Sequence, residues 1–405
     1  MGKVTAVIDA LWGDGGKGGI CDYISNVEDI DIAVRFNGGS NAGHSVEMDD
    51  GTRHKVHLLP AAAFTPGVLC VMGAGTVIDP TKLVEEIHLA NRANHNLKIA
   101  IDSHAHVVTP YHVEKDKQNE ETLGKKKIGT TLTGNGPAYA DKAARTGIRM
   151  KDLTLKGSDL IQKISRSMSF PNVSFPEDNE EIINELCSCG EMLSPMYTDV
   201  AELVNKSIDQ GGSVLFCGAH GTMLDIDYGY YPDVTSSTCT VSGVGVGAGV
   251  SPRRITDAIG VVKAYTTRVG AGPMPTEIEG NLADQIRDKG KEFGTTTGRP
   301  RRIGWLDLPV VKYATMLNGF DYIALTLLDV LSGLKDLSLC TSYRNNGTPV
   351  LNKLPGWDED ISQCGKFRDL PPAARNYVGR IETELGIPVK MISVGPRRSQ
   401  MIDMR

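Results

Sequence analysis

The sequence has no long hydrophobic run and no excess of positive charge. Its 405 residues are 40% hydrophobic and 23% charged, and the formal net charge is −6. A surface of this sign suits neither a nucleic-acid backbone nor an anionic membrane, so we expect neither as a partner. No apolar run reaches about 18 residues, the length that a membrane helix needs. These absences indicate a globular protein that binds any anionic ligand in a pocket.

The sequence also lacks a paired cysteine framework and a leader segment. Its 8 cysteines are scattered without a C-x-x-C motif, which favours a reducing compartment over a disulfide scaffold. The N-terminal segment MGKVTAVIDALW has no charged leader and no small-residue cleavage site, and it runs directly into an expected strand. We therefore expect a cytoplasmic protein.

Short apolar runs rich in β-branched residues alternate with amphipathic stretches along the chain. This alternation predicts an α/β fold in which helices flank a large, mostly parallel sheet. Strands are expected near residues 4–11, 30–36, 68–72, 99–102, 214–218, 322–328 and 389–394. Helices are expected at residues 80–93, 195–209, 252–267, 308–318 and 371–385, several with proline in the first turn. Residues 115–136 are lysine-rich and then glycine-rich, so we expect a mobile active-site loop there.

The segment WGDGGKGG, residues 12–19, directly follows the first expected strand. Its glycines let backbone N–H groups approach an anion, Lys17 adds a positive charge, and a helix starting near Gly18 would present its positive dipole end. It is not a Walker A motif, because no Ser or Thr follows the lysine. Asp14 would repel phosphate unless it holds a metal ion or takes a proton. From this segment alone, a phosphate-binding loop and a solvated glycine turn are equally well supported interpretations.

The segment RFNGGSNAGHS, residues 35–45, follows the second expected strand in the same way. Its histidine, His44, lies among small residues that leave it free to reach a ligand. A lone histidine is usually structural. Ligand sites of α/β proteins, however, form in glycine-rich loops at the carboxyl ends of strands, so we keep His44 as a candidate.

Five further segments are polar, and most of them are rich in glycine. The stretches at 129–147, 216–227 and 231–237 supply hydroxyl groups, amides and Arg145, which suit a phosphate and a polar base. The last two segments are RVGAGPMPTE, residues 268–277, and GTTTGRPRRIGW, residues 294–305. The second brings threonines and three arginines into one loop, which suits carboxylate recognition. A surface charge cluster remains the alternative for any single arginine.

In this order, these segments resemble the adenylosuccinate synthetase family along nearly the whole chain, as far as the C-terminal ISVGP. The resemblance implies one α/β domain spanning residues 1–405, with substrate loops near 37–45, 115–137 and 294–302, and a homodimer. It also implies a C–N ligase that phosphorylates the 6-oxo group of a purine 5′-monophosphate and condenses that carbon with L-aspartate. Mg²⁺ and a nucleoside triphosphate, GTP or ATP, are the implied cofactors.

The resemblance assigns the catalytic roles to two residues. Asp14 would remove the purine N1 proton and bind Mg²⁺, with the backbone oxygen of Gly43 as a second metal ligand. His44 would donate a proton or hydrogen bond to the 6-oxygen. That oxygen is a poor leaving group, so phosphoryl transfer must precede attack by the amine of aspartate. The charge that builds on the phosphoryl oxygens calls for Mg²⁺, Lys17 and backbone amides.

The resemblance also implies the ligand contacts, which fall into three groups. The purine nucleotide would contact Asn41, Thr131, Arg145, His220 and Thr235, with Arg145 reaching across the dimer to the phosphate in the partner's site. L-aspartate would contact Thr295, Thr296, Thr297 and Arg299. The donor would contact Gly13, Gly15, Gly16, Lys17, Gly18, Gly43, Ser45, Arg301, Leu327, Asp329, Ser393, Val394 and Gly395.

The chain departs from the family pattern at three positions, and we expect two of them, Gly15 and His220, to lie at the purine base. Gly15 replaces the usual acidic residue, His220 replaces the usual glutamine, and Ser40 replaces the usual histidine. A small residue beside the purine would leave room for a 2-amino group. This favours the phage 2-aminoadenine branch of the family, which makes N6-succino-2-amino-2′-deoxyadenylate from dGMP; the location would then be the host cytoplasm. Better-known members of that branch replace the catalytic aspartate by serine, whereas Asp14 is retained here.

Two other hypotheses remain open. The chain could be an ordinary adenylosuccinate synthetase that uses IMP and GTP, which Asp14 and the near-complete motif set support. It could also be a nucleotide-binding or regulatory protein that lost activity with the acidic residue at position 15. For the donor, the run Thr326-Leu327-Leu328-Asp329 keeps an aspartate that favours guanine, while Leu327 tolerates adenine equally well.

Overall fold

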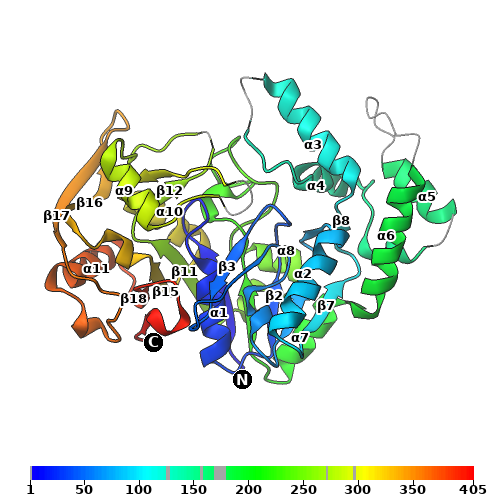
Figure 1. Cartoon of the computed structure of the whole chain (residues 1–405), viewed down its shortest axis with the longest axis horizontal. Coiled ribbons are helices and arrows are strands. Elements are labelled where there is room, and N and C mark those ends of the chain that lie inside the picture. Colours follow the sequence, from blue (N-terminus) through cyan, green and yellow to red (C-terminus); the bar gives the residue numbers. More distant parts are fainter. Residues whose placement is uncertain (1, 125–127, 156–157, 168–178, 271, 295–297) are drawn as a thin grey trace.

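The computed structural model describes residues 2–124, 128–155, 158–167, 179–270, 272–294 and 298–405. A 10-stranded sheet forms the centre of the molecule (Figure 1). Neighbouring strands in this sheet are parallel, except that β18 and β19, at one edge, are antiparallel. The strand order is β19 (Met401–Asp403), β18 (Val389–Ser393), β15 (Tyr322–Thr326), β11 (Asp257–Lys263), β1 (Val4–Asp9), β10 (Val214–Cys217), β2 (Ile32–Arg35), β5 (Leu69–Met72), β7 (Lys98–Asp102) and β9 (Tyr197–Thr198).

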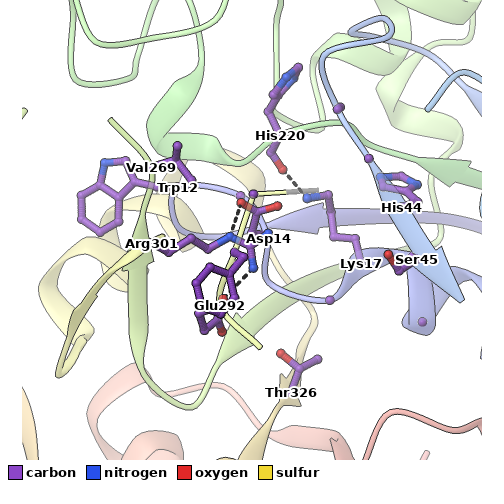
Figure 2. A pocket seen from close by; sticks show the side chains of 18 of the residues that line it. Trp12, Asp14, Lys17, His44, Ser45, His220, Val269, Glu292, Arg301 and Thr326 are labelled. Carbon is purple, nitrogen blue, oxygen red and sulfur yellow. Dashed lines mark hydrogen bonds and ion pairs between the residues drawn. The ribbon is translucent and has the colours of Figure 1, made fainter. Parts of the chain in front are cut away.

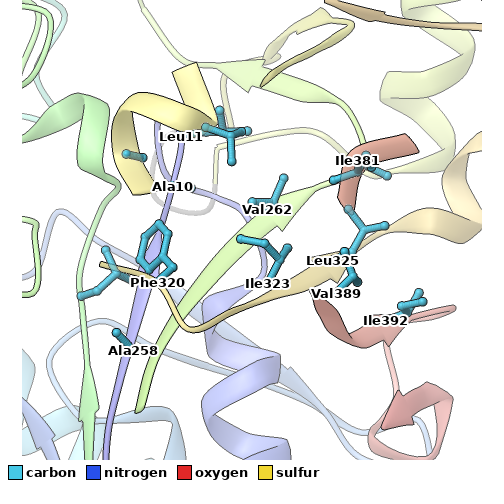
Figure 3. Close-up of a cluster of buried hydrophobic side chains, with 14 of the residues drawn as sticks. Ala10, Leu11, Ala258, Val262, Phe320, Ile323, Leu325, Ile381, Val389 and Ile392 are labelled. Carbon is cyan, nitrogen blue, oxygen red and sulfur yellow. The ribbon is translucent and has the colours of Figure 1, made fainter. Parts of the chain in front are cut away.

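Both faces of the sheet are covered, and for that reason its strands read as nearly continuous apolar runs. In β1, Ala6 and Ile8 pack into the core on one face and Val7 into the core on the other. The same alternation holds in β11 and β15. Figure 3 shows part of the first core, where Val262 and Leu325 meet side chains from the neighbouring strand and helix.

The helices divide between the two faces. Helices α7 (Val200–Asp209), α8 (Gly243–Ala248), α9 (Asn281–Lys289), α10 (Leu308–Asn318) and α11 (Pro372–Leu385) contribute to the core on one face. Helices α1 (Lys17–Val27), α2 (Pro80–Ala93), α3 (Pro110–Leu123), α5 (Ser158–Ser167) and α6 (Asn179–Leu193) contribute to the core on the other. Helix α4 (Asn135–Ala144) packs on α3. The prediction of a mostly parallel sheet with flanking helices is confirmed.

Four small sheets surround the large one. Strands β16 (Leu334–Tyr343) and β17 (Pro349–Trp357) form a long antiparallel hairpin, and β14 (Leu306–Asp307) runs parallel to β16. The other sheets are pairs: β3 (His44–Glu47) with β4 (Arg53–Val56), β12 (Thr266–Arg268) with β13 (Arg302–Gly304), and β6 (Val77–Ile78) with β8 (His106–Val107). No helix in the described ranges is long and apolar enough to span a bilayer.

Two of the predicted helices are wrong in whole or in part. Residues 252–267 were expected to be helical, but they contain β11, the strand between β1 and β15, and the start of β12. The run DAIGVVK is buried almost throughout, so its apolar spacing cannot distinguish a strand from a buried helix. Residues 195–209 also begin differently: the helix starts at Val200, where the side chain of Asp199 caps it, and the edge strand β9 precedes it.

The expected loop at residues 115–137 is largely helical. Helix α3 continues to Leu123, and α4 begins at Asn135. The polar residues of α3 lie on a helix that is exposed along much of its surface, so high polarity did not indicate a loop here. The connection between the two helices is therefore much shorter than expected, and residues 125–127 within it lie outside the described residues.

Candidate active site

A cavity of about 580 Å³ opens at the carboxyl edge of the central sheet. The segments that follow β1, β2 and β10 line it, together with residues at the ends of β15 and β18. This edge is where open α/β sheets place their ligands, and the volume suits a small-molecule site. Figure 2 shows side chains converging on it from segments far apart in the sequence.

Residues 12–18 turn sharply into the start of α1. Gly13, Asp14 and Gly16 have positive φ angles of 81°, 57° and 87°. Glycine adopts such angles at little cost, whereas an aspartate seldom does. Helix α1 begins at Lys17 with no side-chain cap and with no acidic residue in its first turn. Its first N–H groups and its dipole are thus available to an anion.

A buried carboxylate underlies this loop. Asp9 ends β1 and is 1% exposed. Its oxygens accept hydrogen bonds from three backbone N–H groups, those of Leu11 at 2.9 Å, Gly13 at 3.3 Å and Gly15 at 2.8 Å. The ammonium group of Lys17 lies 3.4 Å from the same carboxylate and also donates to the carbonyl oxygen of His220. Asp9 therefore connects the path of the loop to the position of its lysine.

Gly15 faces Asp9 and does not line the cavity. A Cβ atom at position 15 would lie 3.1 Å from Cγ of Asp9 and closer still to its Oδ2. The missing side chain thus leaves its space to the Asp9 carboxylate. The sequence-based interpretation, in which Gly15 makes room beside a purine, gains no support from this geometry.

Asp14 projects into the cavity and meets an arginine there (Figure 2). Its Oδ2 lies 3.0 Å from Nε of Arg301, while Nη1 of Arg301 lies 2.6 Å from Oε2 of Glu292. Glu292 is fully buried and also accepts hydrogen bonds from Lys263 at 2.7 Å and Tyr265 at 2.5 Å. Burial alone would raise the pKa of Glu292, but Lys263 and Arg301 outweigh it and hold that pKa below its ordinary value.

His44 lies in the same cavity but is less free than the sequence suggested. It is 5% exposed, and Nη1 of Arg35 lies 3.0 Å from its Nε2. Burial lowers the pKa of His44 well below its usual value, and the positive charges of Arg35 and Lys17 lower it further. The imidazole is therefore neutral near pH 7 and can donate a hydrogen bond from one ring nitrogen.

Several cavity-lining residues have buried polar atoms without a hydrogen-bond partner, among them Nδ1 of His220 and Oδ1 of Asn41. Buried polar atoms are usually paired, so unpaired ones at a cavity are groups that a ligand could satisfy. Burial, followed by the charges of Arg35 and Lys17, lowers the pKa of His220 to about 3. Both side chains can thus present neutral donors or acceptors to a polar base. Ser40, another departure from the family pattern, directly precedes Asn41 in the sequence. It is buried, and its hydroxyl group also has no hydrogen-bond partner.

The residues predicted to bind the donor base lie at the ends of β15 and β18. Leu327, Asp329, Ser393 and Gly395 line the cavity, and the backbone N–H of Leu327 donates to Oγ of Ser393 at 2.9 Å. Burial raises the pKa of Asp329. Val394 has its side chain in the core and is 0% exposed, so only its backbone can contact a ligand.

The structure brings most of the other predicted residues to the same cavity. Arg299 donates from Nη2 to the backbone oxygen of Gly129 at 3.0 Å, which connects the 294–302 segment to the one that contains Thr131. Arg145 lies apart: it ends α4, is exposed and does not line the cavity. Thr295, Thr296 and Thr297 lie outside the described residues. The predicted residues that line the cavity are Gly13, Asp14, Gly16, Lys17, Gly18, Asn41, Gly43, His44, Ser45, Thr131, His220, Thr235, Arg299, Arg301, Leu327, Asp329, Ser393 and Gly395.

Comparison with known proteins decides the family. The sequence model described as "Adenylosuccinate synthetase" matches residues 6–402. The chain belongs to the adenylosuccinate synthetase family. It is therefore a C–N bond-forming ligase that condenses L-aspartate with a purine nucleotide, as the sequence predicted.

The similarity to individual proteins covers the whole chain. Adenylosuccinate synthetase of Moorella thermoacetica is 46% identical, with 98% of each chain covered. The fully ligated adenylosuccinate synthetase of Plasmodium falciparum has a TM-score of 0.94 and 38% identity, with 100% of both chains covered. The succinoaminodeoxyadenylate synthetase of cyanophage S-2L, bound to dGMP and dATP, has a TM-score of 0.68 and 20% identity, covering 100% of this chain and 96% of that one. The last comparison shows a shared fold alone.

The family uses GTP and Mg²⁺, and the cavity fits both. The carboxylate of Asp14 and the backbone oxygen of Gly43 border the same space, and Mg²⁺ binds through one or two protein oxygens when phosphates and water complete its shell. No group of three or more His, Cys, Asp or Glu residues that could cage a metal occurs within the described part of the chain.

Three residues that shape the site were not identified from the sequence: Asp9, Arg35 and Glu292. Each is buried and touches a predicted site residue. Asp9 and Arg35 did carry a signal, because each is a lone charged residue at the carboxyl end of an apolar strand that leads into a glycine-rich loop. Glu292 carried little signal in the sequence, since Lys263 and Tyr265, which contact it, are distant in sequence.

Proposed function

We propose that this protein is an adenylosuccinate synthetase that joins IMP to L-aspartate with GTP as phosphoryl donor. The observation that carries the choice of purine is the direction of Gly15. The absent side chain at this position faces Asp9 and the core of the loop, so it creates no space for a 2-amino group. The relatives at 44–46% identity carry the name adenylosuccinate synthetase, which supports the same choice.

The cavity residues can perform the chemistry in two steps. Asp14 accepts the N1 proton, which makes the 6-oxygen nucleophilic toward the γ-phosphoryl group. Neutral His44 donates a hydrogen bond to that oxygen, and Lys17 with the N–H groups at the start of α1 stabilises charge on the phosphoryl oxygens. Mg²⁺, when bound by Asp14 and Gly43, adds positive charge at the phosphates. The amine of aspartate, held by Arg299, then displaces the phosphorylated oxygen.

Asp329 supports GTP as the donor. Its carboxylate lies at the end of the cavity formed by Leu327 and Ser393, where it can accept from the N1–H and 2-amino groups of guanine. Adenine has no such pair of donors on that edge. GTP should therefore give a lower KM than ATP.

A substrate assay tests the proposal directly. IMP, GMP and dGMP are offered separately with L-aspartate, Mg²⁺ and either GTP or ATP, and succinylated product is measured by chromatography. We expect kcat/KM to be highest with IMP and GTP. Preferential turnover of dGMP or GMP would contradict the IMP assignment and restore the 2-aminoadenine reading.

We also propose a homodimer in which Arg145 acts in the partner's site. Arg145 is exposed and lies outside the cavity of its own chain, which fits a role across an interface. Arg145→Ala and Asp14→Asn proteins, each nearly inactive, should regain about a quarter of parental activity when mixed and re-equilibrated, because half of the dimers are then mixed and each has one intact site. No recovery in a mixture shown to exchange subunits would rule out the shared site.

A further inference from the structure

The carboxylate of Asp9 stands in the space that a side chain at position 15 would take. Asp9 is almost fully buried at the end of an apolar strand, and burying a charge is costly unless it is paired and hydrogen-bonded. Here the pairing is complete, because one oxygen accepts from Leu11 and Gly13 and the other from Gly15 and Lys17. Through these contacts, Asp9 holds the loop in its observed conformation.

Gly15 allows this arrangement for a steric reason. A Cβ atom there would overlap Oδ2 of Asp9, and that oxygen cannot swing away without losing its hydrogen bonds to the loop. The Gly15 backbone is also fixed from the other side, since Oγ1 of Thr326 donates to its carbonyl oxygen at 2.6 Å. In this geometry, the Asp9 carboxylate and a side chain at position 15 exclude each other.

We propose that Asp9 and Gly15 act as one unit, in which Asp9 supplies from β1 the carboxylate that the family pattern places at position 15. Asp9 is a positioning residue: it touches no reacting atom, but it fixes the N–H groups of the phosphate loop and the ammonium group of Lys17. The inference rests on the proposed function only in taking this loop to hold the donor phosphates.

A charge swap tests the unit. The variants are Asp9→Gly, Gly15→Glu, the double variant that carries both, and Gly379→Ala as control. Gly379 lies within α11, where a Cβ would meet nothing within 4 Å, so its replacement should leave activity unchanged. All are assayed with whichever purine the parent uses best, so a wrong purine assignment does not affect the result.

Each single change should lower kcat/KM for the donor by about 100-fold, because a displacement of about 1 Å in a catalytic loop has an effect of this size. The double variant should recover to within about 10-fold of the parent. The KM for L-aspartate should change little, since its proposed contacts lie on the 294–302 segment. The thermal shift that GTP produces should vanish in the single variants and return in the double one.

Two results would overturn the proposal: a folded Gly15→Glu protein with parental kcat/KM, or a folded double variant no better than the worse single variant. If these proteins fail to fold, Asp9→Asn decides, because it keeps the shape of Asp9 and removes the charge and one of the two acceptor oxygens. A raised donor KM with an unchanged aspartate KM in Asp9→Asn supports the unit, and parental values contradict it. Inactivity of the parent with every purine would instead reject the proposed function, and the GTP thermal shift would still report on the unit.

Discussion

Two buried carboxylates, Asp9 and Glu292, organise the surroundings of the same cavity in different ways. Asp9 accepts mainly from backbone N–H groups close to it in sequence. Glu292 accepts from three side chains: Lys263, Tyr265 and Arg301. The first therefore determines the path of a loop, and the second determines where one arginine points.

These two sets of contacts predict which property each loss affects. Without Asp9, the loop N–H groups could pair with water and Lys17 could turn toward the cavity that it lines, so the fold could accommodate the loss although the loop would move. Without Glu292, the ammonium of Lys263 and the guanidinium of Arg301 would remain buried with no shared counter-charge. We therefore expect changes at Asp9 to affect the donor site, and changes at Glu292 to affect the stability of the whole protein.

The largest effect is expected at Asp14, which lies on the loop that Asp9 shapes and pairs with the arginine that Glu292 holds. Asp14→Asn should lower kcat by about a thousandfold, within the range that general-base catalysis contributes, while the protein stays folded. Steady-state kinetics and circular dichroism measure the two properties. An Asp14→Asn protein with the parental rate would show that Asp14 is not the general base.

Glu292→Gln should lower the free energy of unfolding by about 3–5 kcal/mol, because it breaks a buried ionic group by removing one partner. Urea denaturation measures this. The matched control is Glu277→Gln, which breaks the pair between Glu277 and the next arginine, Arg302, where Nε lies 2.8 Å from Oε1. That pair is about one-third exposed, so the control should cost less than about 1 kcal/mol. An equal loss of unfolding free energy in Glu292→Gln and Glu277→Gln would show that burial does not make the Glu292 ion pairs more important than the exposed pair.

Arg301→Lys should reduce kcat/KM by about 10- to 100-fold, because one ammonium group cannot bind Asp14 and Glu292 as a planar guanidinium does. A double-mutant cycle with Glu292→Asp tests whether Glu292 acts through this arginine. The two changes should then be non-additive, with an interaction energy of about 1 kcal/mol or more in kcat/KM. Strict additivity would show that Glu292 does not affect catalysis through Arg301.

The smallest effect concerns acid stability. The pKa of Glu292 is lowered in the folded state, so the unfolded chain binds its proton first as the pH falls. Its contribution is present above the unfolded pKa of about 4.5 and is lost as the pH falls through the folded pKa, by about 1.4 kcal/mol for each unit of the difference. Unfolding free energies below pH 5 should therefore depend less on pH in Glu292→Gln than in the parent protein. Identical slopes would show that Glu292 does not carry this dependence.

The sequence predicted the helices that carry clear start signals. Proline in the first turn locates α2 and α10, and the structure has both at the expected bounds. The same proline signal failed at Pro252, because it opens only a short turn before β11. A strand buried on both faces has no polar side, so only its position between β1 and β15 identifies it.

The motifs alone identified the family, the type of reaction and many of the residues that line the cavity, because glycines, charged residues and their spacing are local properties of the chain. The role of Gly15 became clear only from its surroundings in the folded chain. The meaning of a missing side chain depends on what occupies its place, and here the occupant is Asp9, brought there by the turn from β1 into α1. The pairing of Glu292 with Lys263 and Arg301 was likewise beyond the sequence, since contacts between distant segments arise only when the sheet has formed.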